Sequence, residues 1–384
     1  MEVRESSFRW QRPAEPTPLQ EKTVNAPAGL LINTAAGPVH VTTPVSRDTW
    51  GELAGLDTET HVTQTPAWLE SVCATGPYRD VSRLYEFEDG GQIVLPLVRR
   101  RQRPERLDAV ESWPAAWGIG GPVSPGRVSP AQARAILDDL DQRPAFRVGV
   151  RLRPGDAEVW AGAASAGFRT EPHMTQVLDL DGGFDTVWER RFHAGLRREV
   201  RRAERSDLEV HVDRTGRFVP VFYDLYEQSI VRWARQQHEP LALARWRRTR
   251  AFPKSWLEAV ASRFGTSCTV LTAWRAGEPA AAIVVLRHGS HGKLWRAAMN
   301  RDLAHPVKAV PLLYRLAIED ACAAGCRRFD MGESRPGSSL AAFKARFGAE
   351  SFSSPRYYRE RLPVSVAERG LRAAAKRLIR FRDA

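Results

Sequence analysis

Residues 268–331 carry the pattern that most restricts how this chain can fold. Two apolar runs, 268–274 and 279–286, flank a short turn that contains a glycine, and this arrangement predicts a β-hairpin. A third run at 293–299 predicts a further strand, and a helix that ends at Gly325 leads into another strand. A hairpin followed by strand, helix and strand predicts an α/β fold in which helices cover a mixed sheet.

A similar order of predicted elements occurs upstream. Residues 82–88 and 92–98 predict a hairpin, a helix opens at Ser129-Pro130, and a strand spans 146–152. We interpret this recurrence as a structural duplication. It predicts an α/β protein of the layered α+β kind, with two tandem domains, mixed central sheets and a cleft between the domains. The expected divisions are a disordered leader over residues 1–40, domains over 41–175 and 176–360, and a basic amphipathic helix over 361–384.

The apolar runs and the cysteines argue against a membrane span, a secretory signal and a metal site. The longest clean apolar run, residues 280–286, is much shorter than the roughly 18 residues of a membrane span. The first forty residues lack the apolar stretch of a secretory signal, so we expect a cytoplasmic protein. The four cysteines form no CxxC pair, and we expect neither a disulfide framework nor a bound metal.

The positive net charge of the chain predicts an anionic partner. The chain has 57 basic and 45 acidic side chains, a net charge of +12, and only six of the bases are lysines. Four segments concentrate the surplus: 99–106, 187–205, 245–254 and the tail from 363. Together they favour an anion-binding groove between the two halves, although each segment alone is compatible with a solvated face.

The basic segment after Leu196 predicts a helix with two parallel rows of arginines. Arg197 and Arg201 form one row, and Arg198 and Arg202 form the other, which suits phosphate or acceptor binding by planar guanidinium groups. The alternative is a surface helix whose charge is partly neutralised by acidic neighbours.

The tail also allows two interpretations. Apolar residues recur at helical spacing on one side, and arginines crowd the other. Such a helix suits peripheral contact with a membrane surface or with RNA. The alternative is a terminal helix packed on the second domain, with its basic side in solvent.

The stretch 329–348 is the most specific in the chain. A strand ends at Asp330, Gly332 and Glu333, a turn follows, and the next helix presents Lys344. This order brings a carboxylate and an ammonium to one site, which suits amide formation, where a proton leaves an amine and an oxyanion develops. An ordinary salt bridge at a strand–helix junction is the alternative.

Phe329-Asp330-Met331-Gly332, Ser338-Ser339-Leu340 and Phe343-Lys344 through Gly348 resemble the C-terminal signature of Fem-type aminoacyltransferases and related bacterial GNAT-type acyltransferases, of the acyl-CoA N-acyltransferase superfamily. Two weaker similarities are Leu196 to Ala203 and Gln64 to Trp68. The resemblance implies tandem GNAT-like domains and transfer of an acyl or aminoacyl group to an amine. It assigns Lys344 to stabilisation of the reacting carbonyl.

The resemblance implies acyl-CoA or aminoacyl-tRNA as co-substrate, with no bound cofactor. The loop 300–308 lacks the glycines that hold pyrophosphate in acyl-CoA enzymes, and we expect Arg301, His305 and Lys308 to bind the donor by side-chain charge. The chain also lacks the long coiled-coil arm of some Fem proteins, so both donors stay open.

We therefore expect direct attack of a small-molecule or peptide amine on the donor, without a covalent intermediate, because no GxSxG or Cys–His motif is present. Lys344 is expected to stabilise the oxyanion, and Asp330 or Glu333 to orient or deprotonate the amine. The alternative is a catalytically degenerate GNAT-like module that binds RNA or an anionic envelope precursor. The sequence predicts no oligomeric state.

Overall fold

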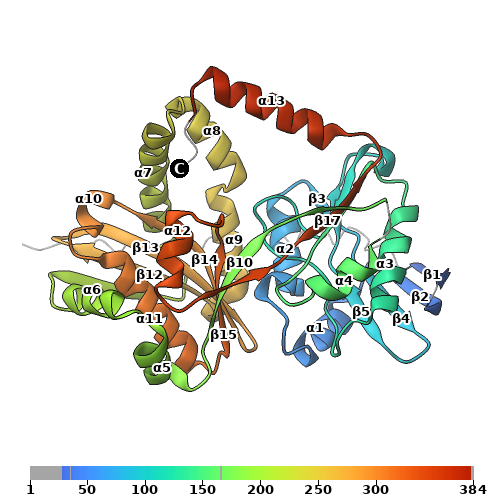
Figure 1. Ribbon diagram of the computed structural model, residues 1–384, viewed down its shortest axis with the longest axis horizontal. Helices are drawn as coiled ribbons and strands as arrows, with labels where there is room; N and C mark the ends of the chain where they lie inside the picture. Colours follow the sequence, from blue (N-terminus) through green and yellow to red (C-terminus); the bar gives the residue numbers. More distant parts are fainter. Residues whose placement is uncertain (1–27, 35, 165–166, 382–384) are drawn as a thin grey trace, which may run out of the picture.

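The computed structural model describes residues 28–34, 36–164 and 167–381 (Figure 1). The strands of the first half are β1 (Ala28–Thr34), β2 (Gly37–Thr43), β3 (Tyr78–Asp80), β4 (Arg83–Phe87), β5 (Gln92–Leu95), β6 (Val98–Arg100), β7 (Ala109–Glu111), β8 (Arg147–Arg151) and β9 (Arg169–Glu171). Its helices are α1 (Arg47–Leu56), η1 (Val62–Gln64), α2 (Pro66–Thr75), η2 (Glu105–Leu107), α3 (Pro130–Gln142) and α4 (Ala157–Ala163).

The second half follows after a short link. Its strands are β10 (Met174–Asp179), β11 (Leu208–Asp213), β12 (Cys268–Arg275), β13 (Glu278–His288), β14 (His291–Met299), β15 (Arg328–Glu333), β16 (Glu350–Ser353) and β17 (Arg356–Glu360). Its helices are α5 (Gly183–Thr186), a π-helical turn η3 (Val187–Arg191), α6 (Ala194–Glu204), α7 (Val219–Gln237), α8 (Leu241–Ala251), α9 (Lys254–Phe264), η4 (Gly265–Ser267), α10 (Arg301–Ala304), α11 (Ala309–Ala323), α12 (Ser339–Ala345) and α13 (Val364–Leu378).

Local sequence signals account for where several helices begin. The Thr65 side chain accepts a hydrogen bond from the Trp68 N–H, and Pro66 occupies the first position of α2, where its missing N–H costs nothing. Ser129 and Gln132 form a capping box at the start of α3. The start of α3 at Ser129-Pro130 confirms the prediction from the sequence.

The strands form three sheets. The orders are β1-β2-β4-β5, β3-β6-β7-β8-β17-β9 and β11-β12-β13-β14-β15-β10-β16. The seven-stranded sheet is mixed, because β14 pairs in parallel with β15 while its other pairings are antiparallel. Two sheet-containing halves with helices on their faces confirm the predicted fold class (Figure 1).

The chain crosses twice between the two halves. The chain crosses from β9 to β10 near His173 and returns from β16 to β17 near Ser354, and the two crossings lie side by side. The Ser354 N–H donates to the His173 carbonyl at 2.9 Å, and the hydroxyls of Thr175 and Ser354 lie 2.9 Å apart. Strand β17 lies within the expected second domain, but it pairs with β8 and β9 of the first half. A division at residue 360 therefore does not separate the two halves.

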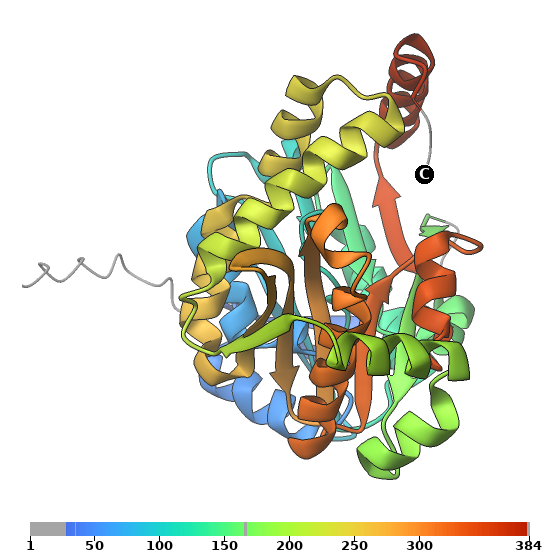
Figure 2. The same cartoon turned by 90° about the vertical axis from the view of Figure 1, so that its left-hand side faces the viewer.

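The helices cover both faces of the seven-stranded sheet. Side chains of β13 alternate between two cores, with Val284 packing toward α7 and α9 and Ile283 packing toward α11 (Figures 1 and 2). The first of these cores continues into the first half, where the Trp68 and Trp295 rings lie 5.3 Å apart. The two halves are thus joined by a common apolar core.

The two ends of the chain agree with expectation only in part. Residues 1–27 of the expected leader lie outside the described residues, but β1 and β2 occupy much of the rest, and β2 pairs with β4. The tail forms α13 as predicted, yet none of its residues is buried, so the alternative of a helix packed on the second domain is wrong. Among the described residues, no helix combines the length and apolarity needed to cross a bilayer.

Candidate functional site

A cavity opens where β14 and β15 separate. The two parallel strands pair only at His291–Arg328, Gly292–Phe329 and Lys293–Asp330, although β14 continues to Met299. Beyond Lys293 the strands diverge and enclose a cavity of about 850 Å³. The lining includes Leu294–Met299 from β14, Met331–Glu333 from β15, residues of α11 and α12, and Ala116, Gly118, Ile119 and Arg151 from the first half. The cavity therefore lies between the two halves, as the sequence predicted.

Lys344 forms part of the cavity wall. The Ser338 side chain caps α12, and this helix places the Lys344 ammonium beside the end of β15. The ammonium donates hydrogen bonds to the carbonyls of Gly332 and Glu333, both at 2.9 Å. Burial lowers the pKa of Lys344 to about 8. Because an ammonium has three N–H donors, these two bonds leave one for the cavity.

Glu333 lines the same cavity and joins the two halves. Its carboxylate accepts from Arg151 Nη2 at 2.8 Å and contacts His173 Nδ1 at hydrogen-bonding distance. Burial raises the pKa of Glu333, but the bond to His173 and the charge of Arg151 outweigh burial and lower the pKa to about 2. The side chain is therefore ionised at neutral pH.

Asp330 does not line the cavity. Its buried carboxylate pairs with Lys293, accepts the Gly332 N–H at 2.6 Å and lies 3.7 Å from His61 Nδ1. Burial raises the pKa of Asp330, but the charges of Lys293 and His61 and these hydrogen bonds outweigh it and lower the pKa. The expectation that Asp330 contacts the substrate amine needs correction, because Asp330 is absent from the cavity lining and its carboxylate is engaged by Lys293 and the Gly332 N–H.

Basic side chains dominate the charge of the cavity. Seven bases line it, Arg151, Arg232, Lys293, Arg296, Lys308, Lys344 and Arg346, against the two acids Glu199 and Glu333. Three of the six lysines of the chain are in this set, which is a large share for so rare a residue type here. An anionic ligand is favoured by this balance.

The predicted donor-binding residues divide into two groups. His305 and Lys308 line the cavity next to the first turn of α11, whereas Arg301 does not. Lys308 adopts the left-handed conformation, with φ +58°, at the N-terminal cap of this 15-residue helix. A helix N-terminus with an adjacent ammonium suits a phosphate group.

The predicted arginine rows on α6 do not meet the cavity. Arg197 is half-buried and donates to the carbonyls of Trp188, Glu189 and Phe192 at the end of η3, so it has a structural role. Arg198, Arg201 and Arg202 are exposed on the same helix, which packs against α11. From α6 only Glu199 reaches the cavity. The alternative of a partly neutralised surface helix is the one that the structure supports.

Sequence reasoning missed Lys293, Arg151 and His61. Lys293 begins the predicted third strand, and its rarity as a lysine was the available signal. His61 lies just before the stretch Gln64 to Trp68, which contains the start of α2. It approaches Asp330 only because the two halves pack together. No local sequence pattern distinguishes Arg151. It lines the cavity because it lies at the end of β8 in the sheet of the first half.

Comparison with known families agrees with this geometry. Residues 190–358 match the family model described as the acetyltransferase (GNAT) domain. This part of the chain thus has the sequence pattern of a GNAT domain. The matched region contains the diverging strands β14 and β15, Lys344 and the start of α11.

Solved structures extend the similarity to both halves. The crystal structure of FemX aligns with a TM-score of 0.62 and 12% identity, over 83% of this chain and 97% of that chain. A conserved protein of unknown function from Bacteroides thetaiotaomicron aligns with a TM-score of 0.53 and 9% identity, over 83% and 98% of the two chains. No curated protein matches the sequence. At these identities the shared property is the fold.

Proposed function

We propose that this chain is an N-acyltransferase that moves an acyl or aminoacyl group from a phosphate-bearing donor to an amine, without a covalent enzyme intermediate. The observation that carries the proposal is the basic cavity between β14 and β15, with the Lys344 ammonium in its wall. A GNAT domain supplies the acyltransferase class.

The donor carries an activated acyl group on a phosphate-bearing carrier. In this proposal its phosphates lie at His305, Lys308 and the N-terminus of α11, and its acyl end lies near Lys344. An acyl thioester of coenzyme A and the aminoacyl ester of a tRNA both have this chemistry. The missing glycines in 300–308 are offset by side-chain charge from Lys308 and Arg346.

The reaction exchanges one acyl bond for another. The amine nitrogen attacks the acyl carbon, the C–S or C–O bond to the carrier breaks, and the carrier leaves as its thiol or hydroxyl after taking a proton. Lys344 directs its third N–H at the developing oxyanion, where a fixed positive charge in a partly dry site is most effective.

Two carboxylates take different roles in this scheme. Glu333 stays ionised and accepts an N–H of the amine, which orients the nucleophile while its proton passes to solvent. Asp330 is a positioning residue, because it holds Lys293 at the end of the paired region of β14.

Direct transfer is supported by the state of the cysteines. None of them lines the cavity. Burial raises the pKa of Cys268 to about 12 and of Cys73 to about 11, so neither supplies a thiolate at neutral pH.

The test compares the two donor sources. Binding of acetyl-CoA and of a mixed aminoacyl-tRNA pool is measured across a salt series, and each donor is then incubated with a panel of amines and analysed by mass spectrometry. Saturable acetyl-CoA binding with amide product assigns the thioester. Binding of tRNA that weakens steeply with salt, with aminoacyl product, assigns the ester. Binding of neither donor contradicts the proposal, and tight RNA binding without product identifies the non-catalytic module instead.

A further inference from the structure

One end of the molecule gathers exposed apolar side chains. This surface comprises η2, α8 and residues 362–381, which contain α13. Hydrogen bonds and an ion pair of Arg143 place η2 near the start of α13, and α13 runs from there along the top of the molecule toward α8 (Figures 1 and 2). We call this surface the α8–α13 face. Of the fourteen large apolar side chains exposed among the described residues, nine belong to it: Leu107, Leu241, Leu243, Trp246, Leu362, Val364, Val366, Leu371 and Leu378. Such a concentration in one region is not expected of scattered surface residues.

Helix α13 divides into an apolar and a basic side. Val364, Ala367, Leu371, Ala374 and Leu378 recur at steps of three and four residues and form one stripe. Leu371 is 72% exposed and Leu378 is 86% exposed. Arg369, Arg372, Lys376 and Arg377 occupy the remaining sides, so the stripe is flanked by cations.

The start of α13 is fixed to the first half. Arg361 donates to the carbonyls of Ala145 and Arg143, and the Ser365 N–H donates to Glu360 at 3.2 Å. The Arg143 guanidinium also pairs with Glu105 of η2 at 2.6 Å, which ties η2 to the same anchor. The exposed stripe therefore belongs to a helix held in place, with its apolar side chains open to a partner.

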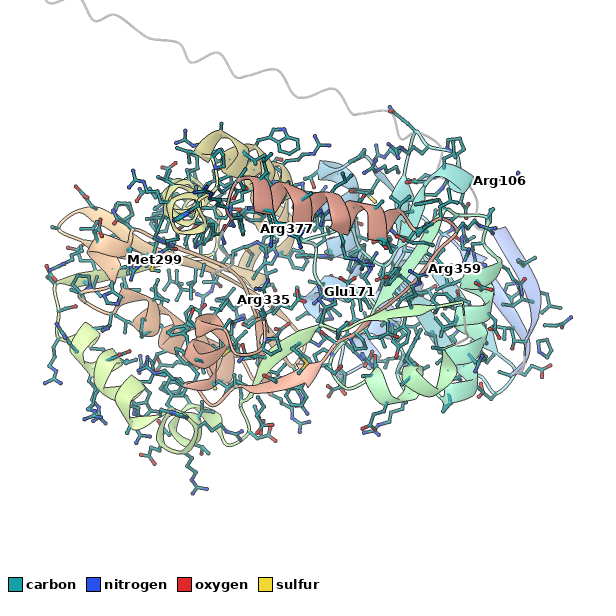
Figure 3. The ribbon with its side chains drawn as sticks, turned by 45° about the horizontal axis from the view of Figure 1, so that its top comes forward. Arg106, Glu171, Met299, Arg335, Arg359 and Arg377 are labelled. Atoms are coloured by element: carbon teal, nitrogen blue, oxygen red, sulfur yellow. The ribbon has the colours of Figure 1, made fainter. Side chains whose placement is uncertain are left out.

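Basic residues surround the apolar ones across the whole face. Segments 99–106 and 245–254 carry ten basic side chains and one acid, and α13 adds four bases and one acid. Figure 3, which brings this end of the molecule forward, shows Arg377 on α13 and Arg106 beyond its start. On α8, the Arg250 guanidinium lies 5.8 Å from the ring of Trp246, which is 61% exposed.

We propose that the α8–α13 face docks on a bilayer that contains anionic lipids, with α13 lying in the plane of the interface. The apolar stripe enters the region between headgroups and acyl chains, and the surrounding arginines pair with lipid phosphates. Trp246 suits this depth because its ring is apolar while its N–H prefers water. The proposal does not depend on the acyltransferase function.

Two other partners fit these observations less well. RNA would pair with the basic side chains, but it offers no continuous apolar surface to cover the stripe between Leu371 and Leu378. A second copy of the chain covers the stripe only by bringing two strongly basic faces together, which is unfavourable without counter-charge. An anionic bilayer matches both the apolar stripe and the charge.

The experiment measures co-sedimentation of the full chain with vesicles of phosphatidylcholine alone and of phosphatidylcholine mixed with phosphatidylglycerol. Variant L371D/L378D breaks the stripe at two exposed positions and leaves the core untouched. Variant R369Q/R372Q removes two charges from α13. Variant R198Q/R202Q is the matched control, since it removes the same charge from exposed positions on α6, which lies on the opposite side of the molecule from α13 (Figure 1).

The expected result is binding to phosphatidylglycerol vesicles that weakens with salt and is weak on phosphatidylcholine alone. Partitioning should fall about tenfold or more in both L371D/L378D and R369Q/R372Q, and should be unchanged in R198Q/R202Q. Failure of the wild-type chain to bind anionic vesicles overturns the proposal. So does wild-type binding by L371D/L378D. A dimer that L371D/L378D dissociates, without vesicle binding, assigns the stripe to a second copy, and tRNA binding without vesicle binding assigns the face to RNA.

Discussion

Lys293 and Asp330 face each other in the last pair that joins β14 to β15, and their side chains form a buried ion pair. Beyond this pair the strands diverge and the cavity begins. Lys293 belongs to the cavity lining, whereas Asp330 lies behind it and also accepts the Gly332 N–H. The ion pair thus links the register of two strands to the shape of the cavity.

Breaking this pair should destabilise the fold. Asp330→Asn leaves the Lys293 ammonium buried without a counter-charge, which costs about 3–5 kcal/mol in the free energy of unfolding. Chemical denaturation measures the loss, with the exposed Asp302→Asn as control. A double variant, K293M/D330L, should be less destabilised than D330N, because no charge is then left alone. Equal stability of D330N and wild type would contradict a buried pair.

The pH dependence of turnover should report the charge of Lys344. Its pKa is lowered by burial to about 8, so its ammonium is lost as pH rises through that value. Activity that depends on this charge should therefore decline above pH about 8. In Lys344→Arg the guanidinium stays protonated, and the decline should move to higher pH even if the maximal rate is lower. An identical high-pH limb in both enzymes speaks against the role of Lys344.

Acid should weaken the junction between the halves. The pKa of Glu333 is lowered to about 2 by its contacts with His173 and Arg151, from an ordinary value of 4.5. The stability that these contacts give is present above the ordinary pKa and is lost as pH falls toward 2. Thermal unfolding over this range should show a steeper loss for wild type than for Glu333→Gln. Parallel curves for the two proteins would show that the contacts of Glu333 with His173 and Arg151 do not stabilise the fold.

Donor affinity should depend on Lys308 and not on α6. Asn tolerates the left-handed conformation at this position, so Lys308→Asn removes the charge with little backbone strain. We expect KM for the donor to rise about tenfold, since one charge-assisted contact is lost, with kcat little changed. R198Q/R202Q should leave both constants unchanged, because these side chains lie outside the cavity. Weaker donor binding in the α6 variant alone would support the prediction from the sequence that these arginines bind phosphate.

Much of the fold is visible in the sequence because its signals are local. The end of α11 before Gly325, the β12–β13 hairpin and the start of α2 at Thr65 follow from turn and capping residues. Strand β17 was also recognisable as a strand. Its partner was not, because pairing of β17 with β8 is decided by contacts between residues about two hundred positions apart.

The site was predictable only in part, because it also depends on contacts between residues that are distant in the sequence. Lys344 and Glu333 stand in one short segment, and the structure places both at the cavity. Asp330 belongs to the same segment, but alternation along β15 and the register with β14 direct it to Lys293. The arginines of α6 repeat at helical spacing, yet packing decides their exposure: Arg197 is half-buried against the end of η3, whereas Arg198, Arg201 and Arg202 remain in solvent.

The most direct test of acyl transfer at this cavity is product formation by Lys344→Ala, measured with the donor that binds and the amine that reacts. Lys254→Ala is the matched control, since Lys254 is a half-exposed lysine on α9 outside the cavity. The account predicts a fall in kcat of about 10²–10³ for K344A, as for loss of an oxyanion donor, and an unchanged rate for K254A. Wild-type turnover by K344A would contradict it.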